Sequence, residues 1–103
     1  MVMSSRLNQG DILKVDRIGK PVLVVSKDFF NTSGEVIGCP IYEGGEPGPL
    51  HIYINAGDIV GYVQCEKLAL LDLNMRAYTK VSRISMSDII NITDAVQGIF
   101  DYI

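Results

Sequence analysis

Residues 21–42 read PVLVVSKDFFNTSGEVIGCPIY, and this stretch decides the fold that we expect. After Pro21 comes a continuous apolar run over residues 22–25, three of them β-branched Val, which is typical of a strand buried on both faces. Residues 28–31 resemble one helical turn. Residues 36–42 form a second apolar run, which closes on Tyr42. The stretch therefore predicts two strands of one sheet, joined by a short helical segment.

Further strands are predicted outside this pair. Apolar and polar residues alternate, or apolar residues dominate, in residues 10–16, 51–54, 61–68 and 78–84. Residues 43–49 hold three Gly and two Pro, a composition that predicts a loop. Five or six short strands of this kind predict a single domain, residues 1–103, with a small and mostly antiparallel barrel-like sheet.

The only convincing helix lies at the C-terminal end. Its apolar residues recur at steps of three and four, at Ile89, Ile92, Val96, Ile99 and Ile103. Ser85 is suited to the N-cap, and Asp88 stands where a capping box places its acid. Ile84 and Ile89 are spaced for a hydrophobic staple across that cap. The pattern predicts an amphipathic helix that covers one side of the sheet.

Composition narrows the classes of function. The net charge of −3 argues against a general nucleic-acid binder, and no apolar run is long enough to cross a membrane. Residues 31–66 carry five acidic groups and no Lys or Arg, whereas Arg17 and Lys20 could form a local cationic strip or part of an ordinary solvated loop. We expect a cytoplasmic protein, because the N-terminus lacks the pattern of a signal peptide.

No nucleotide-binding, metalloprotease or serine-hydrolase motif is present. Cys39 and Cys65 lie in apolar runs, where Cys is usually a small buried hydrophobe. A lone His51 on a strand is more often structural than a ligand, so we expect no metal site. Glu66 is either an outward strand charge or a functional carboxylate. A Tyr near cations can be a core residue or can stack a base of single-stranded RNA.

Four segments, in this order, resemble the MazF/PemK toxins of bacterial toxin–antitoxin pairs. They are QGDILKVD (residues 9–16), KPVLVVSKDFFN (20–31), VIGCPIY (36–42) and GYVQCEKLALLDLNMR (61–76). The resemblance implies a mostly β fold: a small SH3-like barrel of about five to seven strands with a C-terminal amphipathic helix, the CcdB/MazF type. It also implies a symmetric homodimer.

The same resemblance implies a growth-inhibiting toxin of a type II pair. Such an enzyme cleaves single-stranded RNA (mRNA) as an endoribonuclease, needs no metal or other cofactor, and uses the RNA 2′-OH to attack its own phosphate. Its expected partners are the RNA and a cognate antitoxin protein, with no membrane and no DNA contact by this chain alone.

The resemblance also points to site residues, although each differs from the usual family residue. Lys20 stands where the family places Arg before the Pro, and Tyr42 stands where it places Thr or Ser after Cys-Pro-Ile. Residues 64–66, Gln-Cys-Glu, replace Arg-Cys-Asp. The expected catalytic residues are Lys20 for phosphate charge, Glu66 as base and Tyr42 as donor or stacking platform. The expected RNA-binding residues are Arg17, Lys20 and Gln64.

These replacements leave alternatives open. The chain could be a catalytically inactive or altered member of the fold that acts by protein binding, either as a gyrase poison or only as an antitoxin's partner. It could also be a structural or regulatory domain unrelated to toxicity. A cation, a hydroxyl and a carboxylate persist at Lys20, Tyr42 and Glu66, and this favours the endoribonuclease.

Overall fold

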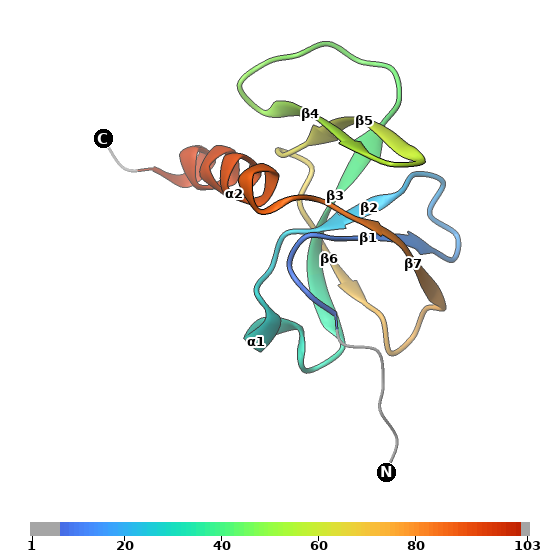
Figure 1. Cartoon of the computed structure of the whole chain (residues 1–103). Coiled ribbons are helices and arrows are strands. Elements are labelled where there is room, and N and C mark those ends of the chain that lie inside the picture. The colour runs from blue at the N-terminus through green and yellow to red at the C-terminus, as the bar shows by residue number, and fades with distance from the viewer. Residues whose placement is uncertain (1–6, 102–103) are drawn as a thin grey trace.

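The structure is a computed structural model that describes residues 7–101 (Figure 1). Along the chain its elements are β1 Asp11–Val15, β2 Val22–Val24, α1 Asp28–Asn31, β3 Glu35–Tyr42, β4 His51–Ala56, β5 Ile59–Gln64, β6 Ala69–Asp72, β7 Tyr78–Arg83 and α2 Met86–Phe100. The strands lie in the order β4-β5-β3-β2-β1-β7, and β6 pairs with β3. All pairings are antiparallel, and the seven strands form a curled, half-barrel sheet, so the expected mostly β, barrel-like fold of about five to seven strands with a C-terminal helix is confirmed.

Strand β3 is the longest strand and joins the two parts of the sheet. Its first half pairs with β6, its middle with β2, and its last two residues with β5. Its side chains alternate between two core clusters, with Val36 in one and Cys39 and Ile41 in the other. The strand therefore holds both halves of the fold together and ends where the core ends, at Tyr42.

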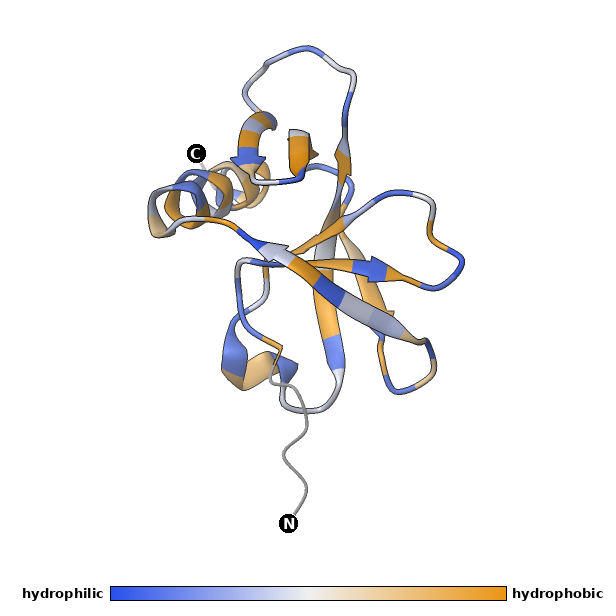
Figure 2. Cartoon of the chain, turned by 45° about the vertical axis from the view of Figure 1, so that its right-hand side comes forward, coloured by the Kyte–Doolittle hydropathy of each residue, from blue (hydrophilic) through white to orange (hydrophobic). Residues whose placement is uncertain are grey.

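The prediction that β2 is buried on both faces is confirmed. Leu23 packs into the cluster that contains Cys39, and Val22 and Val24 pack into the other. Figure 2 shows the apolar residues concentrated along the strands, with polar residues in the long connection between β3 and β4. Pro21 has no backbone N–H to donate to the sheet. It costs no hydrogen bond of the ladder, because it stands just before β2 begins.

Helix α2 begins as predicted and covers the cluster that contains Cys39. The Ser85 Oγ accepts the backbone N–H of Asp88 at 3.2 Å, and Ile84 and Ile89 are both buried in that cluster. The predicted apolar face is only partly correct, because Ile99 is 39% exposed near the end of the helix. The predicted position of Ile103 lies outside the described residues.

The strand predicted at residues 61–68 is divided in the structure. Strand β5 ends at Gln64, a turn follows, and β6 forms at Ala69–Asp72, which the sequence pattern did not predict. Strand β6 pairs with the first half of β3, Val36 against Leu71. That long-range pairing, rather than any local alternation, makes the segment a strand.

A buried carboxylate fastens the first strand to the last. The side chain of Asp11 is 6% exposed, accepts Arg83 Nη1 at 2.8 Å and lies 3.2 Å from Lys80 Nζ. Its second oxygen also accepts the backbone N–H of Asn8 at 2.9 Å. Since a buried carboxylate must be paired, this cluster fixes β1 against the end of β7.

Candidate functional site

Tyr42 lies between two lysines. Lys20 Nζ is 4.8 Å from the centroid of the Tyr42 ring, and Lys67 Nζ is 4.7 Å from it. Lys67 Nζ also donates to the Tyr42 hydroxyl at 3.2 Å. An exposed cation–π contact is worth only about 0.5–1 kcal/mol, so these contacts do little for the fold. They do gather two positive charges around one half-buried tyrosine, which suits the binding of an anion.

The register of the sheet explains why Lys20 reaches Tyr42. Val22 lies opposite Pro40, and Ile41 donates its N–H to the Pro21 carbonyl at 2.9 Å. Continuing this register by two residues brings Lys20 opposite Tyr42. Paired residues of antiparallel strands project on the same face. The proximity of these two predicted residues is therefore built into the backbone.

Tyr42 itself is positioned by a close backbone approach from β5. Gly61 has a φ of 159°, and a Cβ at this position would collide with the Tyr42 carbonyl oxygen. Only glycine allows the two strands to come together in this way. A side chain at Gly61 would therefore disturb the backbone at the end of β3 that carries Tyr42.

A second pair of polar side chains is formed by His51 and Glu66. His51 Nε2 lies 3.0 Å from Glu66 Oε2, and His51 Nδ1 lies 3.3 Å from the Glu46 carbonyl oxygen. Both partners are acceptors, so a neutral imidazole makes one of these hydrogen bonds and an imidazolium makes both. His51 therefore links the carboxylate of Glu66 to the loop between β3 and β4.

This hydrogen bond from His51, with a smaller backbone contribution, holds the pKa of Glu66 below its ordinary value. Glu66 is thus a carboxylate at neutral pH. It does not lie within a strand, as the sequence suggested, but in the turn that follows β5. The turn places the Glu66 side chain on His51 and the next residue, Lys67, on Tyr42.

Two of these residues were missed by sequence reasoning. Lys67 was not singled out, because nothing local shows that the chain turns directly after β5. His51 was interpreted as structural, whereas the structure pairs it with a predicted site residue. The weak signal available was the Glu66-Lys67 dipeptide, an acid and a base next to each other after an apolar run.

The remaining predicted RNA-binding residues are Arg17, in the connection between β1 and β2, and Gln64, which is paired with His51 across β4 and β5. Arg17 has a side chain that is 89% exposed and pairs with Asp16 at 4.0 Å. It lines a separate, open depression of about 440 Å³ between the β1–β2 connection and the start of β7. Gln64 is only 9% exposed, so little of its side chain is available to a ligand.

The structure gives less support to reactive thiols or to a metal site. Burial raises the pKa of Cys39 to about 12 and that of Cys65 to about 11, with smaller effects from nearby charges, so both thiols stay protonated. The prediction that they are buried structural residues is confirmed. Within residues 7–101, no cluster of three His, Cys, Asp or Glu side chains could hold a metal ion. Over the same residues, no helix is long and apolar enough to span a membrane.

Comparison with known proteins gives a consistent result. Residues 8–100 match the model of a family described as PemK-like, MazF-like toxins of type II toxin–antitoxin systems. The endoribonuclease toxin ChpB of Escherichia coli K12 is 30% identical to this chain, in a match that covers 79% of this chain and 83% of ChpB.

Solved structures share the fold at low identity. The MazE–MazF structure (Form-I) from Deinococcus radiodurans superposes with a TM-score of 0.84 at 17% identity, and covers 94% of this chain and 98% of that one. An endoribonuclease from a mycobacterial species gives a TM-score of 0.81 at 16% identity, with coverages of 93% and 92%. At such identities the likeness shows the fold alone.

Proposed function

The chain belongs to the family of PemK-like, MazF-like toxins of type II toxin–antitoxin systems, and from this premise we propose that it is a growth-inhibiting endoribonuclease that cleaves single-stranded RNA. Its similarity to the endoribonuclease toxin ChpB supports this activity. The observation on which the proposal depends is the convergence of Lys20 and Lys67 on the ring of Tyr42, with Lys67 also bound to its hydroxyl.

The proposed reaction is an internal transfer that needs no metal. The RNA 2′-oxygen attacks the adjacent phosphorus, and the bond from phosphorus to the 5′-oxygen of the next nucleotide breaks. The products are a 2′,3′-cyclic phosphate and a 5′-hydroxyl. Proton balance requires a base for the 2′-OH and an acid for the leaving 5′-oxygen, and the phosphorane needs positive charge beside it.

Lys20 and Lys67 would supply the positive charge, and Tyr42 the proton. An ammonium has no lone pair, so in the contact between Lys67 and Tyr42 the phenol oxygen must accept. The phenolic hydrogen is then free to point toward a leaving oxygen. Lys20 stabilises charge as a point cation and does not grip a phosphate with two parallel hydrogen bonds as Arg does.

Glu66 is the proposed base. It is ionised at neutral pH and therefore able to accept the 2′-OH proton, and its hydrogen bond to His51 fixes its orientation. A lowered pKa makes a weaker base, since efficiency is greatest when the pKa lies near the working pH. The Nε2–H that His51 donates to Glu66 is the main cause of this lowered pKa, so His51 orients the carboxylate and weakens it as a base.

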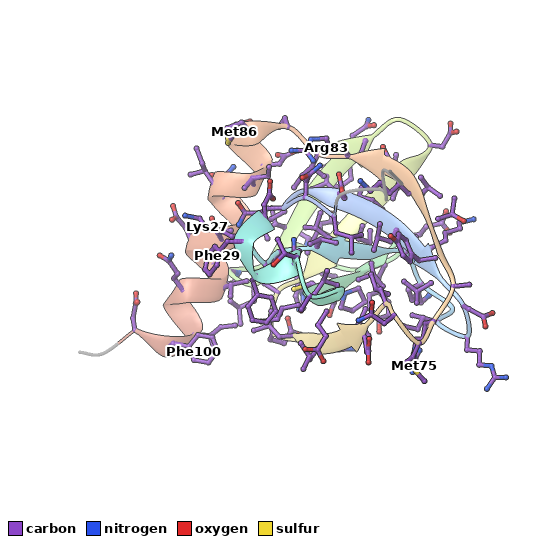
Figure 3. The ribbon with its side chains drawn as sticks, turned by 90° about the horizontal axis from the view of Figure 1, so that it is seen from below. Lys27, Phe29, Met75, Arg83, Met86 and Phe100 are labelled. Carbon is purple, nitrogen blue, oxygen red and sulfur yellow. The ribbon has the colours of Figure 1, made fainter. Side chains whose placement is uncertain are left out.

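Two partners complete the proposal. We propose that the chain forms a homodimer and is neutralised by a cognate antitoxin. Solved relatives of the same fold include a MazE–MazF complex and a mycobacterial endoribonuclease in complex with its cognate antitoxin. Exposed apolar side chains on α2, among them Met86 and Phe100, offer contact area for a protein partner (Figure 3).

The test is RNA cleavage by the purified protein in EDTA. A long single-stranded RNA is incubated with the parent chain and with the Lys20→Ala, Lys67→Ala and Glu66→Ala variants. Lys27→Ala is the matched control, because it removes an exposed lysine beside α1, where β3 begins rather than where it ends (Figure 3). We expect defined cuts by the parent and the control, and strongly reduced cleavage by the other three variants.

The ends of the products and the growth phenotype decide between the alternatives. Cyclic phosphate termini would support attack by the 2′-OH. Growth arrest on expression, with no RNA cut by any of the proteins, would overturn the nuclease and favour a member of the fold that acts by protein binding.

A further inference from the structure

Three tyrosines lie side by side across three neighbouring strands. Tyr42 of β3 is paired with Tyr62 of β5, and Tyr62 is paired with Tyr53 of β4. Directly paired residues project on the same face, so the three form one row, which we name the tyrosine row. The rings of Tyr53 and Tyr62 meet edge to face, with centroids 5.5 Å apart and an interplanar angle of 65°.

The tyrosine row lies on the outer face of the sheet and does not contribute to its core. The neighbouring positions on the same strands, Ile41, Val63 and Ile54, point inward and are buried in one cluster. Tyr53 is 52% exposed, and Tyr42 and Tyr62 are half-buried. Three aromatic side chains are therefore aligned on a face that is partly open to solvent.

Charge along the row changes from one end to the other. Lys20 and Lys67 flank Tyr42, whereas strands β4 and β5, which carry Tyr53 and Tyr62, contain no Lys or Arg. A phosphate is therefore attracted to the Tyr42 end and not to the Tyr53 end. Tyr62 and Tyr53, which form the rest of the row, are suited to bind the uncharged part of a nucleotide, its base.

We infer that Tyr62 and Tyr53 form a platform on which bases next to the scissile phosphate stack. This inference depends on the proposed function and assigns it a further binding subsite. Adjacent strands are about 4.8 Å apart, so Tyr53 lies roughly 10 Å from Tyr42. At about 3.4 Å per stacked nucleotide, that distance corresponds to about three nucleotides. Stacking tolerates any base, because every base has a π-face.

The loop between β3 and β4 borders this platform. A Cβ placed on Gly45 would lie 3.4 Å from Tyr62 Cδ2, so the loop backbone packs against the edge of that ring. His51 holds the same loop through the Glu46 carbonyl. The loop thus limits where a base can lie on Tyr62 and leaves Tyr53 as the open end of the platform.

The test separates binding from cleavage. The probe is a mixed-sequence single-stranded RNA with 2′-O-methyl sugars, which cannot attack its own phosphates, and a second probe lacks the bases but keeps the phosphates. We expect the parent to bind the first probe more tightly. Tyr53→Thr and Tyr62→Thr should weaken binding of that probe by about 5- to 150-fold. Both should bind the abasic probe as the parent does.

Tyr53→Phe is the matched control, since it keeps the stacking ring and should bind as the parent does. The chain has five Tyr and no Trp, so quenching of tyrosine emission on binding, reduced in the Thr variants, gives a direct readout of stacking. Thermal unfolding confirms that each variant is folded, and Thr is chosen because it suits a strand.

The outcomes distinguish the two ideas. If the Thr variants bind both probes as the parent does, the platform is refuted, even where the enzyme cuts RNA. If base-dependent binding is present and lost in the Thr variants while EDTA assays show no cleavage, the platform stands and the proposed nuclease falls.

Discussion

Replacing Tyr42 by Phe removes one oxygen atom from the centre of the proposed site. The ring stays, and with it the contacts of Lys20 and Lys67 over its face. The hydrogen bond from Lys67 is lost. The variant therefore tests the hydroxyl as a proton donor with little change in shape or charge.

The expected effects on rate and on stability differ widely. Losing a general acid lowers the rate by about 10²- to 10⁴-fold, which corresponds to about 2.7–5.4 kcal/mol of barrier. The lost hydrogen bond joins an exposed lysine to a half-buried hydroxyl, so its net contribution to folding is about 0.5–1 kcal/mol. For a domain of this size that is a fall in melting temperature of only about 2–8 °C.

The assay is single-turnover cleavage of RNA by the parent and by Tyr42→Phe, with thermal unfolding of both. A second substrate carries sulfur in place of the 5′-bridging oxygen at the cut, because a thiolate leaves without being protonated. The difference between the two proteins should nearly vanish on this substrate. A Phe variant that cuts ordinary RNA at the parent's rate, or one that stays equally slow on the thio substrate, would refute the proton-donor role.

Further predictions concern binding, pH and stability. Lys20→Ala should reduce the slope of log K against log salt for single-stranded RNA by about 0.7, the value for one lost phosphate contact, as a salt titration would show. His51→Ala should move the acid limb of the pH–rate profile to higher pH, because the pKa of Glu66 is held down mainly by the bond from His51, and rates measured across the acid range would test this. Asp11→Ala should lower the free energy of unfolding, measured in urea titrations, by about 2–4 kcal/mol, because it removes a buried acceptor of charge-assisted hydrogen bonds. The loss is no larger because Lys80 and Arg83 stay partly solvated without it. Asp58→Ala, in the exposed turn between β4 and β5, is the control and should change stability little.

Local periodicity predicted the fold wherever the burial of a segment is set by its own pattern. The continuous apolar run of β2 and the capped, amphipathic start of α2 are examples. Strand β6 was missed because residues 61–68 were interpreted as one strand, and no local signal marks the turn at residues 65–66 that separates β5 from β6. Its strand state comes from pairing with β3, a contact between distant segments that no local pattern records.

Part of the site was predictable from the same strand pattern, and the rest was not. Lys20 and Tyr42 flank the strand pair that the sequence predicts, so their meeting follows from its register. Lys67 and the bond between His51 and Glu66 depend on a turn after β5 and on the path of a Gly/Pro-rich loop. Such geometry is set by tertiary contacts, and residue types alone do not determine it.

The position of Tyr42 explains how this fold can keep its core while the residues of its site change. Strand β3 buries Val36, Cys39 and Ile41, and these side chains bear the packing energy of the strand. Tyr42 is the next residue, and it projects from the sheet just beyond the core, with its polar contacts to exposed lysines. Substitution there therefore costs little stability and alters chemistry directly. A tyrosine with two lysines can occupy this end of the strand because the cores of β2 and β3 are complete without it.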